Sequence, residues 1–333
     1  MRTFIIAEIG INHNGNLNIA KKMIDLAAKT GADAVKFQTY KTENLVIKNA
    51  PKANYQKRNL NSKTKIYDLL KKNELSEKDF KLLKKRCKKN KIEFLSSAFD
   101  LDSIKLLNRI GVSKWKIPSS EINNFPYLKE IGKFNKKIFL STGMSNLKEI
   151  KESIDILVKS GTNKNKITIL HCTTDYPAKF QDLNLKAMLT IKNKFSTQIG
   201  YSDHSNGIEV PIAAVAMGAQ VIEKHFTLSK KMKGVDHKAS LNFLEFKNMV
   251  IAIRNIEKAL GSKKKILSFS EKKNLPIVRK SIVASKAIKK GEVFTINNIT
   301  TKRPGYGISA IFWNKLIGKR SNKNYKIDSL IKK

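Results

Sequence analysis

The sequence lacks any long hydrophobic run, and its first ten residues, MRTFIIAEIG, hold only four consecutive apolar residues before Glu8. Such a run is too short for the apolar region of a signal peptide or for a membrane span. Cysteine is scarce as well, because Cys87 and Cys172 are the only two in 333 residues, too few for a disulfide framework. We therefore expect a reduced, cytoplasmic protein with no membrane partner.

Arginine and acidic residues are also few. Of the 66 basic residues only eight are Arg, and 27 acidic residues leave a formal net charge of +39. A nucleic-acid binder is one interpretation, since clustered cations release counterions from phosphate backbones. The lysines, however, are spread along the chain without a basic tail, and Arg is the usual bidentate reader of phosphates and bases. We expect a solvated, Lys-rich surface and no nucleic-acid partner.

Strand-like apolar runs alternate with amphipathic helical stretches eight times over about 260 residues, which is the count and length of a (β/α)8 TIM barrel. An open doubly wound sheet is the main alternative, but EIGINHNGN after the first run lacks the G-x-G-x-x-G spacing of its phosphate loop. The predicted strands cover residues 3–9, 34–39, 92–97, 114–119, 137–142, 167–173, 198–203 and 220–226.

Three segments do not fit the strand–helix alternation. Residues 40–75 are too long for an ordinary loop between a strand and a helix, and long insertions at that face of a barrel usually cover or build a site. The polar, Lys-rich segment 262–277 is interpreted as a linker, and 278–333 contains short strands and Gly turns. We expect a barrel domain at 1–261, a linker at 262–277 and a small C-terminal domain at 278–333.

A barrel builds its active site at the C-terminal ends of its strands, and polar residues gather there in this sequence. Lys36 and Lys116, with several hydroxyls, suit a small phosphate or phosphate–carboxylate anion; the alternative is that both lysines extend out of the strand ends into water. His204 and His225 end two successive strands and could share a divalent metal with open coordination positions, with Asp203 orienting one of them. The alternative for this pair is two histidines satisfied by hydrogen bonds.

Ten motifs, in order along nearly the whole chain, resemble the sialic acid synthase family, whose members join phosphoenolpyruvate to an N-acylated amino sugar. They are IIAEIGINHNG, GADAVKFQTYK, APKANYQ, KWKIPSSEINNFPYL, STGM, TILHCTTDYP, GYSDHS, IEKHFTL, DHKAS and TTKRPGYGIS. The resemblance implies a (β/α)8 barrel followed by an antifreeze-like (SAF) domain, which matches the division reached from periodicity and composition.

The resemblance also implies a role for each matching residue. A divalent ion, Mn2+ or Mg2+, would be held by His204 and His225. Glu121, Glu8 and Lys116 would be the catalytic residues, with Glu121 handling the proton of the attacking water. Phosphoenolpyruvate would be bound by Lys36, Ser97, Lys116, Ser119, Ser141 and Ser202, and the sugar by Glu8, Gln38, Tyr176, Asp236 and Arg303. Arg303 would come from the SAF domain of a second chain, which implies a homodimer with swapped domains.

The motifs are compatible with more than one acceptor sugar, and the sequence differs from the family pattern at several positions. N-acetylmannosamine, giving N-acetylneuraminate, is the first prediction. A diacetamido-trideoxy hexose giving legionaminate is the close alternative, and pseudaminate synthesis is a further one. IPSSE stands where the family has P-S-G-E, so Ser120 replaces a glycine beside Ser119 and Glu121 and could crowd the phosphate. LSSAF and KGVDH likewise place Ala98 and Val235 where the family has proline.

Overall fold

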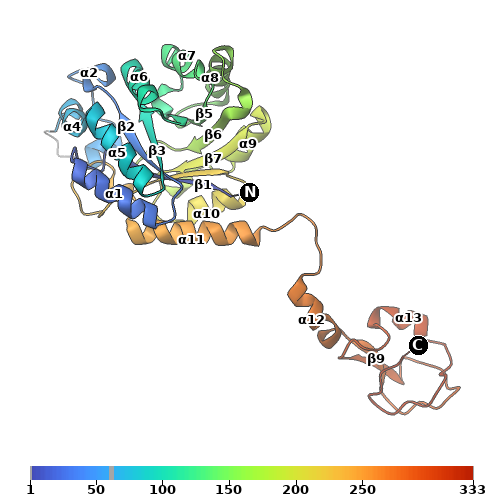
Figure 1. Cartoon of the computed structure of the whole chain (residues 1–333). Helices are drawn as coiled ribbons and strands as arrows, with labels where there is room; N and C mark the ends of the chain where they lie inside the picture. The colour runs from blue at the N-terminus through green and yellow to red at the C-terminus, as the bar shows by residue number, and fades with distance from the viewer. Residues whose placement is uncertain (1, 60–63, 333) are drawn as a thin grey trace. The chain divides into compact units, whose positions relative to one another are not determined.

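The computed structural model describes residues 2–59 and 64–332, which divide into two compact units, Met1–Gly261 and Ser262–Lys333. In the first unit eight parallel strands close into a barrel in chain order, with β8 beside β1 (Figure 1). This confirms the predicted TIM barrel and excludes the open sheet. The strands are β1 (Phe4–Gly10), β2 (Ala34–Thr39), β3 (Glu93–Ala98), β4 (Lys114–Ile117), β5 (Lys137–Ser141), β6 (Ile167–Cys172), β7 (Gln198–Asp203) and β8 (Val221–His225).

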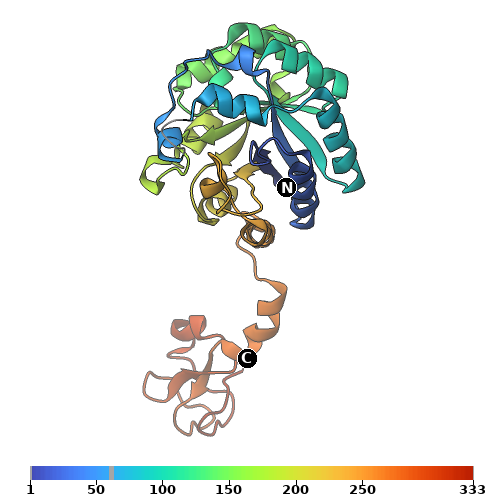
Figure 2. The same ribbon diagram turned by 90° about the vertical axis from the view of Figure 1, so that its left-hand side faces the viewer.

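A ring of helices surrounds these strands (Figure 2). Several helices begin at side chains that cap free backbone N–H groups: Asn16 caps α1, and Asn146 and Asn242 form capping boxes with Glu149 and Glu245 at the starts of α8 and α11. The ring comprises α1 (Leu17–Lys29), α5 (Glu77–Lys89), α6 (Leu101–Ile110), α7 (Phe125–Gly132), α8 (Leu147–Lys159), α9 (Ala187–Phe195), α10 (Glu209–Ala216) and α11 (Phe243–Ala259).

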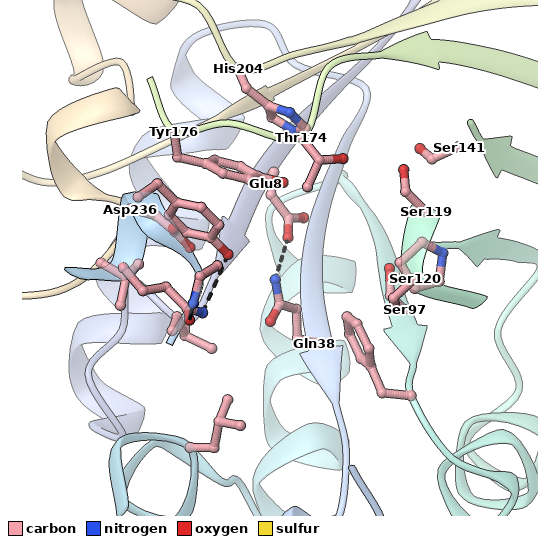
Figure 3. A pocket seen from close by; sticks show the side chains of 18 of the residues that line it. Glu8, Gln38, Ser97, Ser119, Ser120, Ser141, Thr174, Tyr176, His204 and Asp236 are labelled. Atoms are coloured by element: carbon pink, nitrogen blue, oxygen red, sulfur yellow. Dashed lines mark hydrogen bonds between the residues drawn. The ribbon is translucent and has the colours of Figure 1, made fainter. Parts of the chain in front are cut away.

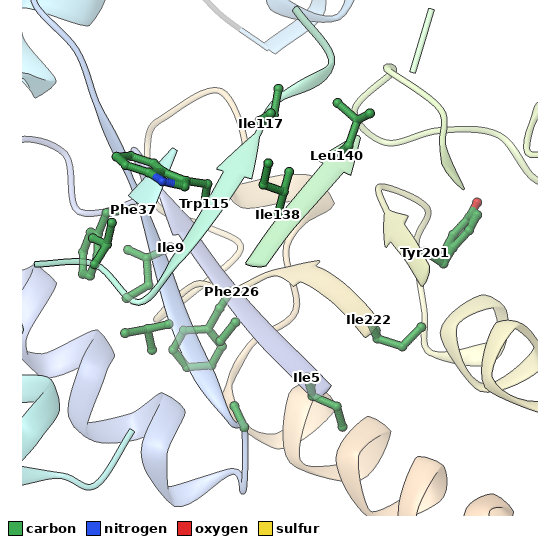
Figure 4. Close-up of a cluster of buried hydrophobic side chains, with 14 of the residues drawn as sticks. Ile5, Ile9, Phe37, Trp115, Ile117, Ile138, Leu140, Tyr201, Ile222 and Phe226 are labelled. Carbon is green, nitrogen blue, oxygen red and sulfur yellow. The ribbon is translucent and has the colours of Figure 1, made fainter. Parts of the chain in front are cut away.

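Alternate strand residues point outward and pack against the helices, as the period of two in a strand requires. Figure 4 shows part of this outer core, with Ile5 and Ile9 of β1, Trp115 and Ile117 of β4, and Ile222 of β8. All five side chains are fully buried. The outer core therefore fixes which residues of each strand face the interior of the barrel.

The barrel interior is built in layers. A small apolar layer is followed, two residues further along each strand, by a layer of different composition. The first layer contains Ile6, Ala34, Leu95, Phe139, Leu170 and Val221. The second contains Glu8, Lys36, Ser97, Ser141, Cys172 and Glu223. Gly200 of β7 leaves room for the first layer, because a Cβ at this position would lie 2.5 Å from Leu170 Cδ2.

The insertion between β2 and α5 holds three short helices, α2 (Thr42–Leu45), α3 (Asn54–Asn59) and α4 (Ile66–Asn73). Asn59 Nδ2 donates hydrogen bonds to the carbonyls of Tyr176, at 3.2 Å, and Val235, at 2.8 Å. Arg58 pairs with Asp175 at 2.6 Å. The insertion is thus bonded to the loops that follow β6 and β8, so it lies at the C-terminal face of the barrel.

The second unit has a hydrophobic core of its own, formed by Ile282, Ala284, Ile288, Phe294, Ile299, Leu316, Tyr325 and Ile331. Its regular elements are α12 (Phe269–Val278), β9 (Ser281–Ala284), β10 (Ile299–Lys302) and α13 (Trp313–Leu316), with β9 and β10 antiparallel. Helix α12 lies largely within the segment expected to be a linker, and its Pro276 carbonyl accepts a hydrogen bond from the Gly305 N–H at 2.7 Å. Within the described ranges, no helix is both long and apolar enough to cross a bilayer.

Candidate active site

A cavity of about 430 Å3 opens at the C-terminal ends of the barrel strands (Figure 3). Every predicted site residue lines it except Glu121, Arg303 and Asp203. The cavity is therefore the candidate active site. The predicted residues that it brings together are Glu8, Lys36, Gln38, Ser97, Lys116, Ser119, Ser141, Tyr176, Ser202, His204, His225 and Asp236.

Both predicted lysines lie inside the barrel and are only 3% exposed, so the alternative that they extend into water is wrong. Lys36 Nζ lies 2.8 Å from Glu8 Oε2 and 3.1 Å from Ser97 Oγ. Burial acts to lower the pKa of Lys36, but Glu223 and Glu8 outweigh it and leave a net rise. In Lys116 burial outweighs the attraction of Glu223 and lowers the pKa.

Two buried carboxylates balance these cations. Glu223 Oε1 lies 3.5 Å from Lys116 Nζ, and its Oε2 lies 3.7 Å from Lys36 Nζ. Burial opposes ionisation of Glu223, but the two lysines dominate and lower its pKa to about 2. In Glu8 burial dominates and raises the pKa to about 7.

A group of hydroxyls forms another side of the cavity, where Figure 3 shows Ser97, Ser119 and Ser141. Ser119 Oγ accepts a hydrogen bond from the Gly143 N–H at 2.9 Å. Gly143 permits this approach, because a Cβ there would lie 2.9 Å from the same oxygen and 2.2 Å from Thr174 Oγ1. Ser141 Oγ and Thr174 Oγ1 are buried without a hydrogen-bond partner among the described residues, so both are available to a ligand.

The rings of the two predicted metal ligands are neighbours in an edge-to-face arrangement, with centroids 5.6 Å apart. His204 Nδ1 donates to the Thr173 carbonyl at 2.6 Å, so its Nε2 carries the lone pair. The nearest polar contact of this Nε2 is Ser202 Oγ at 3.5 Å, and that hydroxyl donates to Glu223 Oε1 at 2.9 Å. His225 Nδ1 is buried without a partner among the described residues. Burial lowers the pKa of His204 to about 4 and that of His225 well below its usual value, so both rings are neutral, as metal ligation requires. The donor set therefore fits a divalent ion with open positions. In the described ranges no third His, Cys, Asp or Glu completes a metal cluster with them.

Asp203 does not orient either histidine, contrary to the sequence expectation. It forms a fully buried ion pair with Lys224 and accepts hydrogen bonds from the backbone N–H and hydroxyl of Ser205, at 3.0 and 2.7 Å. The carbonyl of Thr173 is the group that orients His204. Asp203 and Lys224 are neighbours across β7 and β8 and hold the ends of these strands together.

The four sugar contacts that are predicted in the barrel, Glu8, Gln38, Tyr176 and Asp236, all line the cavity. The Tyr176 ring lies 4.2 Å from that of His204, between centroids. Gln38 Nε2 donates to Glu8 Oε1 at 3.4 Å. No hydrogen bond to the Asp236 carboxylate is seen in the described part of the chain, and burial raises its pKa to about 6.

Glu121 and Arg303 are the other predicted residues outside the cavity lining. The Glu121 carboxylate accepts hydrogen bonds from Ser120 Oγ at 3.0 Å and Asn124 Nδ2 at 2.6 Å, within the turn that follows β4. Ser120 does not have a positive φ, so its side chain causes no backbone strain in place of glycine. Arg303 is exposed in the second unit.

Glu223 is the main residue that sequence reasoning did not select for a role, although it stands two residues before His225. That spacing places both side chains on the inner face of β8, so the signal was present. Thr174, Tyr55 and Phe99 also line the cavity. They come from loops and from the insertion, where no periodicity indicates which side chains face inward.

Comparison with known proteins gives a consistent result. The model of the NeuB family matches residues 23–265, and that of the SAF domain matches 279–333. N,N'-diacetyllegionaminic acid synthase of Campylobacter jejuni is 54% identical over 331 residues, 99% of each chain. Human N-acetylneuraminate-9-phosphate synthase is 36% identical over 322 residues, 95% of this chain and 88% of that protein. The crystal structure of an N-acetylneuraminic acid synthetase from Leptospira borgpetersenii, 36% identical, matches with a TM-score of 0.72 over 82% of this chain and 90% of that one.

Proposed function

The chain belongs to the NeuB family of sialic acid synthases and ends in a SAF domain, and from this premise we propose that it makes a legionaminic acid. Its relatives are nonulosonic acid synthases, so the chain is a phosphoenolpyruvate-dependent transferase that forms a carbon–carbon bond. The proposed acceptor is 2,4-diacetamido-2,4,6-trideoxymannose. N-acetylmannosamine, predicted first from the sequence, is not favoured, because identity is 54% to the legionaminic acid synthase and 36% to the human enzyme.

One structural observation carries the chemistry: two buried lysines and a row of hydroxyls lie in the same cavity as a pair of neutral histidines. Lys36 and Lys116 bind the phosphate and carboxylate of phosphoenolpyruvate, and Ser97, Ser119 and Ser141 donate hydrogen bonds to the phosphate oxygens. Cations held there also stabilise the phosphate as it leaves.

The reaction begins when C3 of phosphoenolpyruvate attacks the aldehyde carbon of the open-chain sugar. The electrons of the C2–C3 double bond form the new bond, and C2 becomes cationic. Water adds to C2 and gives one proton to the alkoxide formed from the aldehyde oxygen. The new C2 hydroxyl then loses its proton as the bond between C2 and the phosphate oxygen breaks, which releases phosphate and leaves a ketone at C2. A divalent ion held by His204 and His225 would supply a Lewis acid for the aldehyde oxygen.

Glu8 is the carboxylate that we assign to proton transfer, because it lies in the cavity beside Lys36 and Gln38. Glu121 is the residue predicted from the sequence for this role, but it does not line the cavity, and its two oxygens accept hydrogen bonds from Ser120, which does line it, and from Asn124. In the proposed scheme Glu121 holds the turn that carries Ser119.

Arg303 is proposed to bind the sugar from the SAF domain of a second chain in a homodimer with swapped domains. It is exposed, and no hydrogen bond or ion pair of its guanidinium is seen in the described ranges. A planar guanidinium with fixed donors suits sugar hydroxyls and acyl carbonyls.

The test is phosphate release from phosphoenolpyruvate in the presence of Mn2+ and one sugar at a time. We expect release only when both substrates are present, with a higher kcat/KM for the diacetamido sugar than for N-acetylmannosamine. A higher value for N-acetylmannosamine would overturn the choice of sugar, and no release with any N-acylated amino sugar would overturn the proposed synthase activity.

A further inference from the structure

One side of the cavity is apolar and separate from the barrel core. Six residues, Ile11, Leu45, Leu69, Leu70, Phe99 and Val235, belong to a distinct hydrophobic cluster and also line the cavity; we name them the apolar wall. They come from α2 and α4 of the insertion and from the loops that follow β1, β3 and β8. The wall is thus assembled from four segments far apart in the sequence, and it is closed by the insertion.

Ring contacts connect the wall to the histidines. Tyr55 packs against the wall cluster, and its ring centroid lies 4.8 Å from that of Tyr176. Tyr176 in turn lies 4.2 Å from His204. The two lysines have other neighbours, the carboxylates Glu8 and Glu223. Tyr176 therefore lies between His204 and Tyr55, which packs against the wall, so the wall adjoins the histidines through these two tyrosine rings.

These ring contacts indicate how an acceptor sugar would lie, and the step rests on the proposed function. Its aldehyde carbon must meet C3 of phosphoenolpyruvate, whose phosphate is held by the lysines. The rest of the open chain then extends past Tyr176, and its terminal carbon, C6, reaches the wall. Against these six apolar side chains a hydroxyl on C6 would lose hydrogen bonds to water, whereas a methyl group would bury apolar surface.

We propose that the apolar wall is the subsite for C6 of the acceptor sugar and that it selects a 6-deoxy sugar over its 6-hydroxy counterpart. An apolar pocket rejects an added hydroxyl only partly, so the expected preference in kcat/KM is about 10- to 100-fold. The wall gives a physical reason for the 6-deoxy acceptor proposed above.

The experiment compares N-acetylmannosamine with 6-deoxy-N-acetylmannosamine, two sugars that differ by one oxygen atom. Phosphate release is measured with saturating phosphoenolpyruvate and Mn2+. The wild-type chain should prefer the 6-deoxy sugar, mainly through a lower KM, because C6 is remote from the reacting carbon. A preference below about twofold would overturn the proposal.

Variants of the apolar wall then test whether its residues cause the preference for the 6-deoxy sugar. Leu69→Asn places a polar group on the wall and should reduce the ratio of the two kcat/KM values by about tenfold. Val235→Thr is nearly isosteric, so it tests the same point if Leu69→Asn fails to fold. Ile47→Asn is the matched control, because Ile47 lies in the same insertion, is 75% exposed and does not line the cavity; its ratio should equal that of the wild type.

The outcomes separate this inference from the proposed function. Phosphate release with both sugars at equal kcat/KM would leave the synthase activity standing and refute the wall as a C6 subsite. A wild-type preference that both folded wall variants retain in full would also refute it. Absence of release with any N-acylated amino sugar would instead overturn the proposed function, and the inference with it.

Discussion

Replacement of Asp236 by Asn should stabilise the barrel at neutral and alkaline pH. The carboxylate is 8% exposed, and burial raises its pKa from 3.8 to about 6, with no cation among residues 2–59 and 64–332 to offset the loss of water. A shift of about two units corresponds to about 3 kcal/mol of free energy of unfolding. Asn has a similar shape and does not ionise, so the variant avoids this cost.

The gain in stability of Asp236→Asn should depend on pH, because only the wild-type carboxyl group titrates. Between pH 3.8 and about 6 the folded state retains the Asp236 proton while the unfolded state has lost it. The contribution of Asp236 to the stability of the wild type therefore falls as pH rises through that window and is level above it. The gain in Asp236→Asn should be near zero below the window and reach its full value of about 3 kcal/mol above it.

Urea unfolding followed by tryptophan fluorescence measures this difference. Trp115 is fully buried in the barrel, and a Trp313→Phe background removes the signal of the second unit. Asp182→Asn, at an exposed position of the barrel, is the matched control and should change stability by less than about 0.5 kcal/mol. A gain that does not vary with pH, or a variant less stable than the wild type at about pH 8, would refute the reasoning. The same variant should bind sugar more weakly, because Asp236 is proposed to contact the sugar through the carboxylate whose burial destabilises the barrel.

Three further predictions concern the proposed site. Lys116→Met should abolish phosphate release in a folded barrel, whereas Lys129→Met, at an exposed position of α7, should not; an active Lys116→Met chain would remove the proposed phosphate site. His204→Ala and His225→Ala should each weaken Mn2+ binding by about tenfold or more in calorimetric titration without substrates, and unchanged affinity would exclude them as ligands. Inactive Arg303→Ala and Lys116→Met chains should regain activity on mixing, because one site of the mixed dimer carries neither defect; mixed dimers that stay inactive would exclude a role for Arg303 in the partner's site.

Most of the barrel could be predicted from the sequence because its signal is local. Each strand is a short apolar run, and its predicted and observed ends differ by at most two residues. Lys36, Lys116, His204 and His225 were identifiable because strand ends in a closed parallel barrel converge, so polar residues there must share one cavity.

The alternation of side chains between the two faces of a strand explains why Asp203 does not contact His204 and why Glu223 shares the cavity with His225. Asp203 precedes His204, and Lys224 lies between Glu223 and His225, so both point away from the cavity and pair with each other. This alternation was readable in the sequence, and it would have excluded Asp203 as a partner of His204. Glu121 is different, because it lies in a 3-10 turn after β4, where no simple alternation applies.

The preferred sugar could not be predicted from the strand-end motifs for a physical reason. Those motifs bind the reacting groups, which all members of the family share, whereas the far end of the sugar meets side chains supplied by the insertion and by three separate loops. Leu69 and Val235 are 166 residues apart in the sequence and become neighbours in one cluster only when the barrel closes and the insertion folds over it. Specificity for the far end of the acceptor is therefore a property of the tertiary structure, and substitutions in the insertion are expected to change it without disturbing the lysines and histidines that carry the chemistry.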